Sequence, residues 1–220
     1  MSKRTVLVSI CFLGILLAWK APPVCAGYKA RNWSVDTRNS YPSRLTSEGV
    51  TIAVEPFFSD ALAAQVFDKN DIVTRGIMPL AVIIFNDNDF PIRVDGLSIE
   101  LIYAEDKIRT LLPNEVVYLI FGKEKSWIRQ QIPIPQNSRS GLNQDALNDF
   151  DAKFLSEKTI APHEKGGGFL YMPINDSKNI GTLLGNAIVY IPKIYRQDEG
   201  TRLIFFEIGL SAAINATPKR

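Results

Sequence analysis

The sequence predicts a mainly β protein, namely one β-sandwich domain with a helical insertion that is preceded by an export signal. Apolar and polar residues alternate from Gly49 onward with the period of two that is typical of strands with one buried face. Over about residues 113–157 the apolar residues follow the period of a helix, and the period of two then returns. The 194 residues that follow the expected signal suffice for one domain, and no linker rich in Pro, Gly or Ser divides them.

The first 26 residues have the composition of a cleavable export signal. Two basic residues precede an apolar run of 14 residues, Val6–Trp19, and a short stretch with two prolines follows it. Val24 and Ala26 occupy the positions that signal peptidase reads, so we expect cleavage between Ala26 and Gly27. The mature protein is then expected in the periplasm or outside the cell.

Two other fates of this segment are less favoured. A membrane-spanning helix needs about 20 apolar residues, and the run is shorter, so retention as an anchor is the weaker alternative. A lipid-bearing cysteine at Cys25 would normally follow a small residue, with a Leu-like residue two places earlier. Val24 and Pro22 stand at those positions.

Charge and cysteine content bound the partners of the mature chain. Removing residues 1–26 takes away three of the 25 basic residues and none of the 23 acidic ones, so the formal charge changes from +2 to −1. Such a chain has no electrostatic footprint for nucleic acid, and we expect membrane contact only through the signal. Cys11 and Cys25 leave with the signal, so no disulfide forms, which suits a bacterial envelope.

The start of the mature chain is expected to be irregular. Residues 27–48 are polar, with aromatic residues at no regular period, which predicts an extended or loosely packed N-terminal arm. Ordered structure is expected to begin at Gly49, where residues 50–55 alternate as a strand with one buried face.

The next elements are strands and turns with one short helix. The helix is expected over 61–67, capped by Ser59 and Asp60, and a central strand buried on both faces follows over 80–85. After a turn over 86–89, a strand over 97–103 is expected, which a turn at Glu105 and Asp106 joins to a strand over 108–111.

The middle of the chain is expected to be helical. Helices are predicted near 114–121 and 143–157, separated by a loop rich in Pro, Ser and Asn. The second helix carries an apolar stripe that includes Phe150 and Phe154, which leaves Asp149 mostly outside the stripe.

The C-terminal third returns to strands. A strand over 169–174 follows a triple glycine, and 187–191 is expected to pair with 203–210. Leu203 and Phe205 make the second face of the last strand apolar, so we expect the middle helices to cover it. The expected division of the chain is a signal over 1–26, an arm over 27–48, the sandwich domain over 49–214 with its insertion at about 113–157, and a tail over 215–220.

Two stretches of the sequence share a rhythm with known proteins. In residues 86–101 an asparagine and a short acidic turn precede Pro91 and renewed apolar alternation, and Ile160-Ala161-Pro162 leads through glycines into Phe169. These stretches resemble the exported immunoglobulin-like sandwiches of bacteria, and water-stress and late-embryogenesis-abundant domains are similar to them. The resemblance covers about 49–112 and 158–211. It implies an immunoglobulin-like β-sandwich and no catalytic residue.

The residue types that usually carry catalysis are scarce. His163 is the single histidine, it stands beside a proline and before three glycines, and no G-x-S-x-G motif occurs, so a surface turn is favoured over a catalytic role. The usual zinc sites need three or four nitrogen or sulfur ligands, and they are excluded by one histidine and no mature cysteine. The triple glycine at 166–168 precedes a strand rather than a helix, which disfavours a phosphate-binding loop. We therefore expect no cofactor.

Clusters of acidic residues offer two further possibilities. The turn 86–89 could chelate calcium, but Pro91 and Ile92 stand where a calcium loop needs an oxygen ligand and a glycine. A turn is favoured, and calcium held by one or two loop oxygens stays open. The pairs Glu105-Asp106 and Asp149-Asp151 could serve a glycosidase only if two acids faced each other across a cleft, and sequence neighbours are normally solvated.

These observations favour a binding module rather than an enzyme. Its partner would be an envelope protein or polymer, and Trp127 and Arg129 are the candidate anchor, because aromatic and arginine side chains dominate interface energies. A tryptophan that simply packs under the insertion is the alternative for Trp127. A carbohydrate-active enzyme with carboxylates from separate loops and a passive stress-protective domain are the competing functions.

Processing of the signal can be tested by intact-mass measurement of the exported protein. We expect the mass of residues 27–220, and we expect Ala26→Tyr to block cleavage because a bulky residue does not fit the peptidase groove. A protein that keeps Met1, or that bears lipid on Cys25, would contradict the prediction.

Overall fold

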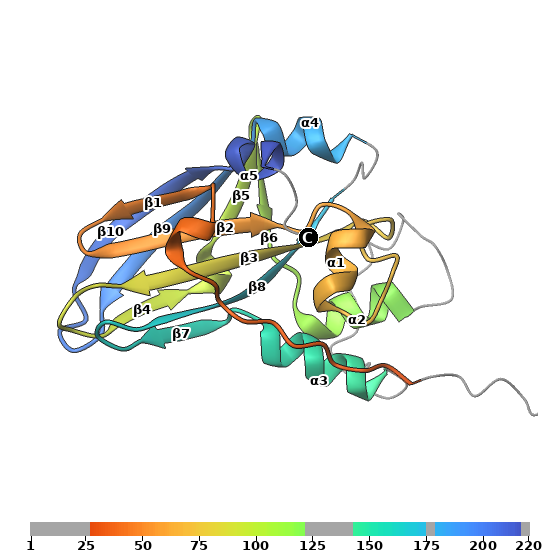
Figure 1. Ribbon diagram of the computed structural model, residues 1–220, viewed down its shortest axis with the longest axis horizontal. Helices are drawn as coiled ribbons and strands as arrows, with labels where there is room; N and C mark the ends of the chain where they lie inside the picture. Colours follow the sequence, from red (N-terminus) through yellow and green to blue (C-terminus); the bar gives the residue numbers. More distant parts are fainter. Residues whose placement is uncertain (1–26, 122–142, 175–178, 217–220) are drawn as a thin grey trace, which may run out of the picture.

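The computed structural model describes residues 27–121, 143–174 and 179–216, and within them the chain is mainly β (Figure 1). Within these ranges ten strands form two antiparallel sheets, accompanied by five α-helices and two short 3-10 helices. The mainly β prediction is therefore confirmed. A hydrophobic core cluster includes residues of both sheets and of the helices. Within these ranges no helix has the length and apolar character needed to cross a membrane.

The four-stranded sheet holds the most deeply buried strand. Its order is β1 (Arg44–Ser47), β2 (Val50–Pro56), β3 (Ile77–Asn86) and β8 (Lys165–Pro173), and all neighbours are antiparallel. All ten residues of β3 are buried, which confirms the central strand predicted over 80–85.

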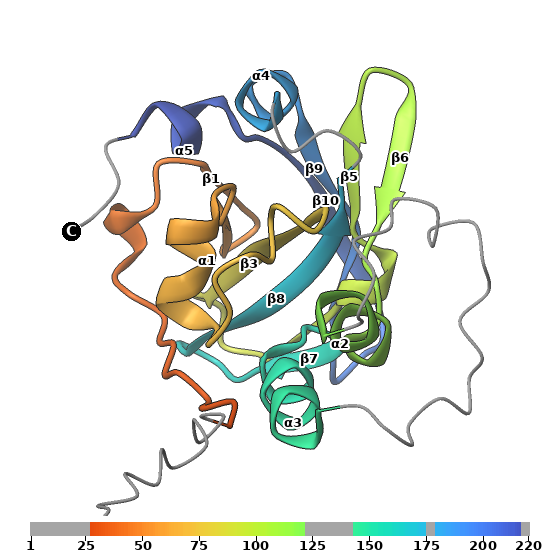
Figure 2. The ribbon, with the colours of Figure 1, turned by 90° about the vertical axis from the view of Figure 1, so that its right-hand side faces the viewer.

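The single buried face predicted for β2 is wrong. Glu55 is the only residue of this strand that is not buried. Figure 2 shows the reason, because helix α1 (Asp60–Val66) and the N-terminal segment lie on the side of the sheet that faces away from the second sheet. The strand is thus buried between two layers.

The second sheet is built around one long strand. Its strands are β6 (Asp106–Arg109), β5 (Glu100–Tyr103), β9 (Ile188–Arg196), β4 (Ile92–Asp95), β7 (Glu157–Ile160) and β10 (Arg202–Gly209). One edge of β9 pairs with β10, as predicted, and the other edge pairs with β5 and then with β4.

The continuous strand predicted over 97–103 is wrong, because the 3-10 turn η2 (Gly96–Ser98) separates β4 from β5. The backbone of Gly96 lies so close to Leu155 that a Cβ there would stand 1.8 Å from the Leu155 oxygen. The Asp95 carboxylate accepts a hydrogen bond from the Leu97 amide at 3.0 Å, which stabilises the turn. Leu97 is consequently exposed.

The ordered chain begins before the predicted start at Gly49. Residues 44–47 form β1, which pairs with β2 through a tight hairpin. Glu48 and Gly49 have φ angles of 49° and 68°, the left-handed conformation that two-residue hairpin turns require. Glycine takes this conformation without strain, and Glu48 takes it at a cost that the paired strands offset.

The three predicted helices begin close to their predicted positions, but the one predicted over 143–157 ends at Lys153. Ser59 Oγ accepts a hydrogen bond from the Leu62 amide at 3.2 Å and so caps α1. The other helices are α2 (Pro113–Phe121) and α3 (Gln144–Lys153), which lie between β6 and β7 and form the predicted helical insertion, then α4 (Ile180–Gly185) and α5 (Ser211–Asn215).

Helix α3 packs against β8 and not against the last strand. The ring of Phe150 stacks on Phe67, with centroids 4.4 Å apart, and Phe154 stacks on Tyr171 at 5.9 Å. The prediction that the middle helices cover the second face of β10 is wrong, since Phe205 remains 50% exposed. The aromatic residues of the insertion pack instead against the aromatic side chains of β8.

The triple glycine lies within β8 and is not a flexible lead into it. A Cβ at Gly167 would stand 2.4 Å from the Val82 oxygen, and a Cβ at Gly168 would stand 2.9 Å from the Lys153 oxygen. The absence of side chains therefore lets the end of α3 and the neighbouring β3 approach β8 closely.

Asn86, at the end of β3, ties two loops together from a buried position. Its Nδ2 donates to the carbonyl oxygens of Phe90 (2.8 Å), Ile160 (3.2 Å) and Ala161 (3.1 Å). Its Oδ1 accepts from the amide of Asn88 at 3.1 Å, which forms the turn predicted over 86–89. Both ends of the side chain are thus hydrogen-bonded.

Changing Asn86 to aspartate should destabilise the fold. A carboxylate cannot donate to the three carbonyl oxygens, and its charge would be buried against them, so we expect a loss of about 3 kcal/mol in the free energy of unfolding. Urea denaturation at pH 7 measures this. Asn39→Asp, at an exposed position, is the matched control. Similar losses for both variants would contradict the role of Asn86.

Candidate functional site

The N-terminal segment 27–42 runs extended across the outer side of the four-stranded sheet (Figures 1 and 2) and is fastened at several points. These contacts join Tyr28 Oη to Asp149 Oδ2 (2.6 Å), Arg31 Nη2 to Asp68 Oδ1 (3.0 Å), Lys165 Nζ to the Val35 oxygen (3.0 Å) and Arg38 Nη2 to Asp87 Oδ1 (2.5 Å). Tyr28 and Tyr41 are buried, so the prediction of a loosely packed arm is wrong.

Asp149 anchors the first of these contacts. It was expected outside the apolar stripe of its helix, but it is buried. Besides the Tyr28 hydroxyl, its carboxylate accepts a hydrogen bond from Lys153 Nζ, one turn further along α3. Lys153 Nζ also lies 5.0 Å from the ring centre of Phe67. Both oxygens of Asp149 have donors, which offsets much of the cost of burying its charge.

The ionisation of this cluster points to a structural role. Burial raises the pKa of the Tyr28 phenol above its usual range, and the hydrogen bond to Asp149 raises it further. Burial lowers the pKa of Lys153, and the nearby Asp149 opposes this shift. A phenol with a raised pKa does not lose its proton near neutral pH. The Tyr28 hydroxyl therefore holds the arm as a hydrogen-bond donor and is not suited to acid–base catalysis.

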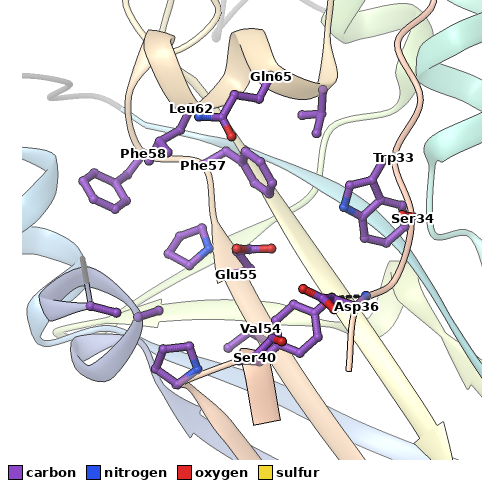
Figure 3. A pocket seen from close by; sticks show the side chains of 16 residues that line it. Trp33, Ser34, Asp36, Ser40, Val54, Glu55, Phe57, Phe58, Leu62 and Gln65 are labelled. Carbon is purple, nitrogen blue, oxygen red and sulfur yellow. Dashed lines mark hydrogen bonds between the residues drawn. The ribbon is translucent and has the colours of Figure 1, made fainter. Parts of the chain in front are cut away.

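A surface cavity of about 260 Å³ lies between the N-terminal segment, β2, α1 and the region of α5 (Figure 3). Its lining combines aromatic, carboxylate, hydroxyl and amide groups from these four regions. The lining includes Trp33, Ser34, Asp36, Glu55, Phe57 and Phe58. Such a mixture of apolar surface and a few polar groups is typical of small-molecule binding sites.

Trp33 forms one wall of the cavity. Its ring meets Phe169 edge to face, with centroids 4.8 Å apart, and lies above Gly167, where a Cβ would stand 3.3 Å from the indole. Figure 3 shows the indole nitrogen on the side that faces the cavity. Among the described residues no side chain or backbone oxygen accepts a hydrogen bond from it. The indole therefore presents a donor to the cavity.

Two carboxylates face the same space. Figure 3 shows the Glu55 carboxylate of β2 directed into the cavity, which Asp36 of the N-terminal segment also lines. Asp36 Oδ1 accepts a hydrogen bond from the Thr37 amide at 2.7 Å. Tyr41 Oη accepts a hydrogen bond from the Asp36 amide at 2.8 Å, which fixes the backbone at that position. Burial raises the pKa of Tyr41, while its hydrogen bond from the Asp36 amide opposes this. The cavity thus offers acceptors on two sides and a donor from Trp33.

Apolar surface completes the cavity. Phe57 is buried and Phe58 half-buried, and both follow β2 directly. Phe57 packs against Phe169 with centroids 5.4 Å apart, so the aromatic residue on β8 supports both Phe57 and Trp33.

Among the described residues, those singled out in the sequence do not line this cavity. Trp127 and Arg129 lie outside the described residues, as does Ala26, and Gly27 is exposed. His163 lies in a turn with φ of 58° and contacts Asp89 at 2.9 Å, so it occupies the surface turn that was predicted.

The acidic pairs are also dispersed. Asp149 is buried in its network while Asp151 is exposed, and Glu105 and Asp106 lie exposed at the β5–β6 hairpin. Asp87, in the turn over 86–89, forms an ion pair with Arg38 of the N-terminal segment. No group of three or more His, Cys, Asp or Glu within the described ranges is arranged to hold a metal ion.

Sequence reasoning missed the residues of the cavity. Trp33 and Tyr41 appeared as scattered aromatics in a polar segment, and Glu55 appeared as the polar end of a strand. The one available signal was the aromatic content of residues 27–48, because exposed polar segments rarely carry large aromatic side chains without packing them.

Comparison with known proteins gives this chain no relative. None of the protein-family models, curated proteins or solved structures compared with it matches. No match therefore supports the immunoglobulin-like resemblance or a particular function.

The contact between Tyr28 and Asp149 can be tested through its pH dependence. Tyr28→Phe removes one donor of a buried carboxylate, which should lower the free energy of unfolding by about 1–3 kcal/mol at pH 7. Above the ordinary tyrosine pKa of 10.0, the unfolded wild-type chain releases this proton and the folded chain keeps it. Wild-type stability should therefore fall with rising pH, and the fall in the variant should be shallower by up to about 1.4 kcal/mol per pH unit.

Urea denaturation at pH 7 and at several pH values above 10 measures both effects. Tyr103→Phe, on the other sheet, makes the same chemical change away from Asp149 and serves as the control. Equal pH slopes for the wild type and Tyr28→Phe would show that Tyr28 does not keep its proton.

Proposed function

We propose that this protein is an exported, non-catalytic immunoglobulin-like β-sandwich that acts as a binding module in the cell envelope, with the cavity at Trp33 and Glu55 as its site. The observation that carries the proposal is the set of groups around that cavity. A donor, two carboxylates and aromatic surface from the N-terminal segment and from residues 55–58 converge there, and α1 and the region of α5 complete the lining. Convergent polar groups in an apolar hollow are the usual mark of a binding site.

The rigidity of the walls supports binding. Lys165 fixes the backbone of residues 35 and 36 through two carbonyl oxygens, at 3.0 and 3.3 Å, and Phe169 supports both Trp33 and Phe57. A site whose walls are already ordered loses little conformational entropy when a ligand binds.

A carbohydrate-active enzyme is the second candidate function. The observation in its favour is that Asp36 and Glu55, carboxylates from separate segments, line the same cavity. Glycoside hydrolysis uses two acids that face a common space. Turnover of envelope polysaccharide that is abolished by Glu55→Gln would establish this alternative and reject the binding module.

Site-specific photo-crosslinking in the native envelope tests the proposal. A photoreactive amino acid replaces Ser34, which is exposed at the cavity, and in a second variant it replaces Lys107, on the distant strand β6 (Figure 2). We expect discrete adducts from position 34 that disappear when Trp33→Ala is added, and none from position 107. No adducts at position 34, or the same adducts at both positions, would overturn the proposal.

A further inference from the structure

We infer that the cavity takes one hydroxyl-rich sugar ring, such as a terminal or branching residue of an envelope polysaccharide. This inference rests on the proposed function and names the class of its ligand. It depends on three properties of the cavity, which are its size, its hydrogen-bonding groups and its aromatic surface.

The size of the cavity limits the ligand. Its volume of about 260 Å³ lies below the roughly 300–1,000 Å³ of pockets for drug-sized molecules. A single six-membered sugar ring suits such a space, whereas a length of polymer or a folded peptide does not. The bulk of a larger ligand would stay outside.

The hydrogen-bonding groups select the chemistry of the ligand. The Trp33 indole only donates, and the ionised carboxylates of Glu55 and Asp36 only accept. A hydroxyl group both donates and accepts, so neighbouring hydroxyls on one ring can bond the indole and a carboxylate together. A carboxylate or phosphate ligand could use the indole but would face two carboxylates. An ammonium ligand could use the carboxylates but would leave the indole donor unpaired.

The aromatic groups suit the remaining face of a sugar. A sugar ring has an apolar face of C–H groups besides its hydroxyls, and Phe57 and Phe58 offer apolar surface in the same cavity. Burial of that face would add hydrophobic contact to the hydrogen bonds. A linear polyol lacks such a face and should bind more weakly.

The test follows the indole N–H resonance of Trp33 by two-dimensional NMR in the exported protein. Of the three tryptophans of the chain, Trp19 leaves with the expected signal, so the exported protein has Trp33 and Trp127, and Trp33→Phe identifies the Trp33 signal by its loss. If that variant does not fold, Trp127→Phe assigns the signal by elimination. The probes are glucose, galactose and N-acetylglucosamine, with sorbitol and tetramethylammonium as the contrasting ligands.

We expect at least one of the three sugars to shift the Trp33 signal saturably, with a dissociation constant on the order of millimolar. Glu55→Gln should weaken this binding about tenfold, because it removes a charged acceptor. Glu105→Gln, which makes the same change on the exposed hairpin, should leave binding unchanged and is the matched control.

The other outcomes separate the two proposals. A shift with tetramethylammonium and with none of the sugars would overturn the sugar inference, and the binding module would stand. No shift with any probe, while the adducts at position 34 persist, would also overturn the sugar inference alone. Loss of those adducts as well would overturn the proposed function. Hydrolysis of a glycoside of the bound sugar would support the ligand class and reject a non-catalytic role.

Discussion

The close approach that the glycine run of β8 permits is the constraint on which the rest of the structure depends. Without side chains at positions 166–168, the backbone of Lys153 and the indole of Trp33 can both come against the four-stranded sheet. The end of the helical insertion and the N-terminal segment thus both pack against β8. Any Cβ at Gly167 would meet the backbone of β3, which cannot move aside as a flexible side chain could. A run that looks like a flexible loop in the sequence is therefore a tightly packed part of a strand.

The buried polar network at Asp149 follows from this arrangement. Once α3 lies against β8, Asp149 is buried and Lys153 is half-buried, and Asp149 needs partners at fixed positions. The Tyr28 hydroxyl supplies one of these partners, and the Phe67 ring supplies an electrostatically favourable neighbour for the ammonium group. A buried carboxylate that a half-buried lysine compensates contributes more to a single arrangement of arm and helix than to net stability. The network therefore determines where the arm begins, and so the course of the wall that carries Trp33.

The candidate site is a consequence of how the arm is held. Each wall of the cavity has a structural reason that lies outside the cavity itself: Phe169 supports Trp33 and Phe57, Lys165 holds the backbone at Asp36, and β2 carries Glu55 out of an otherwise buried strand. The cavity can thus be changed apart from the network that holds the arm. Glu55 can be changed without touching Asp149, whereas Tyr28 holds the start of the arm that carries Trp33.

The sequence by itself determined those strands and helices whose signals are local. The β-branched run over 80–85 predicted the buried β3, the alternation near the end predicted the β9–β10 pair, and Ser59 predicted the cap of α1. The tertiary structure alone decided the break at Gly96, the burial of Asp149 and the packing of the arm. Tyr28 and Asp149 stand 121 positions apart, and no period within either segment encodes their meeting. The cavity joins four separate regions of the chain, so its groups acquire a common chemistry only after the chain has folded.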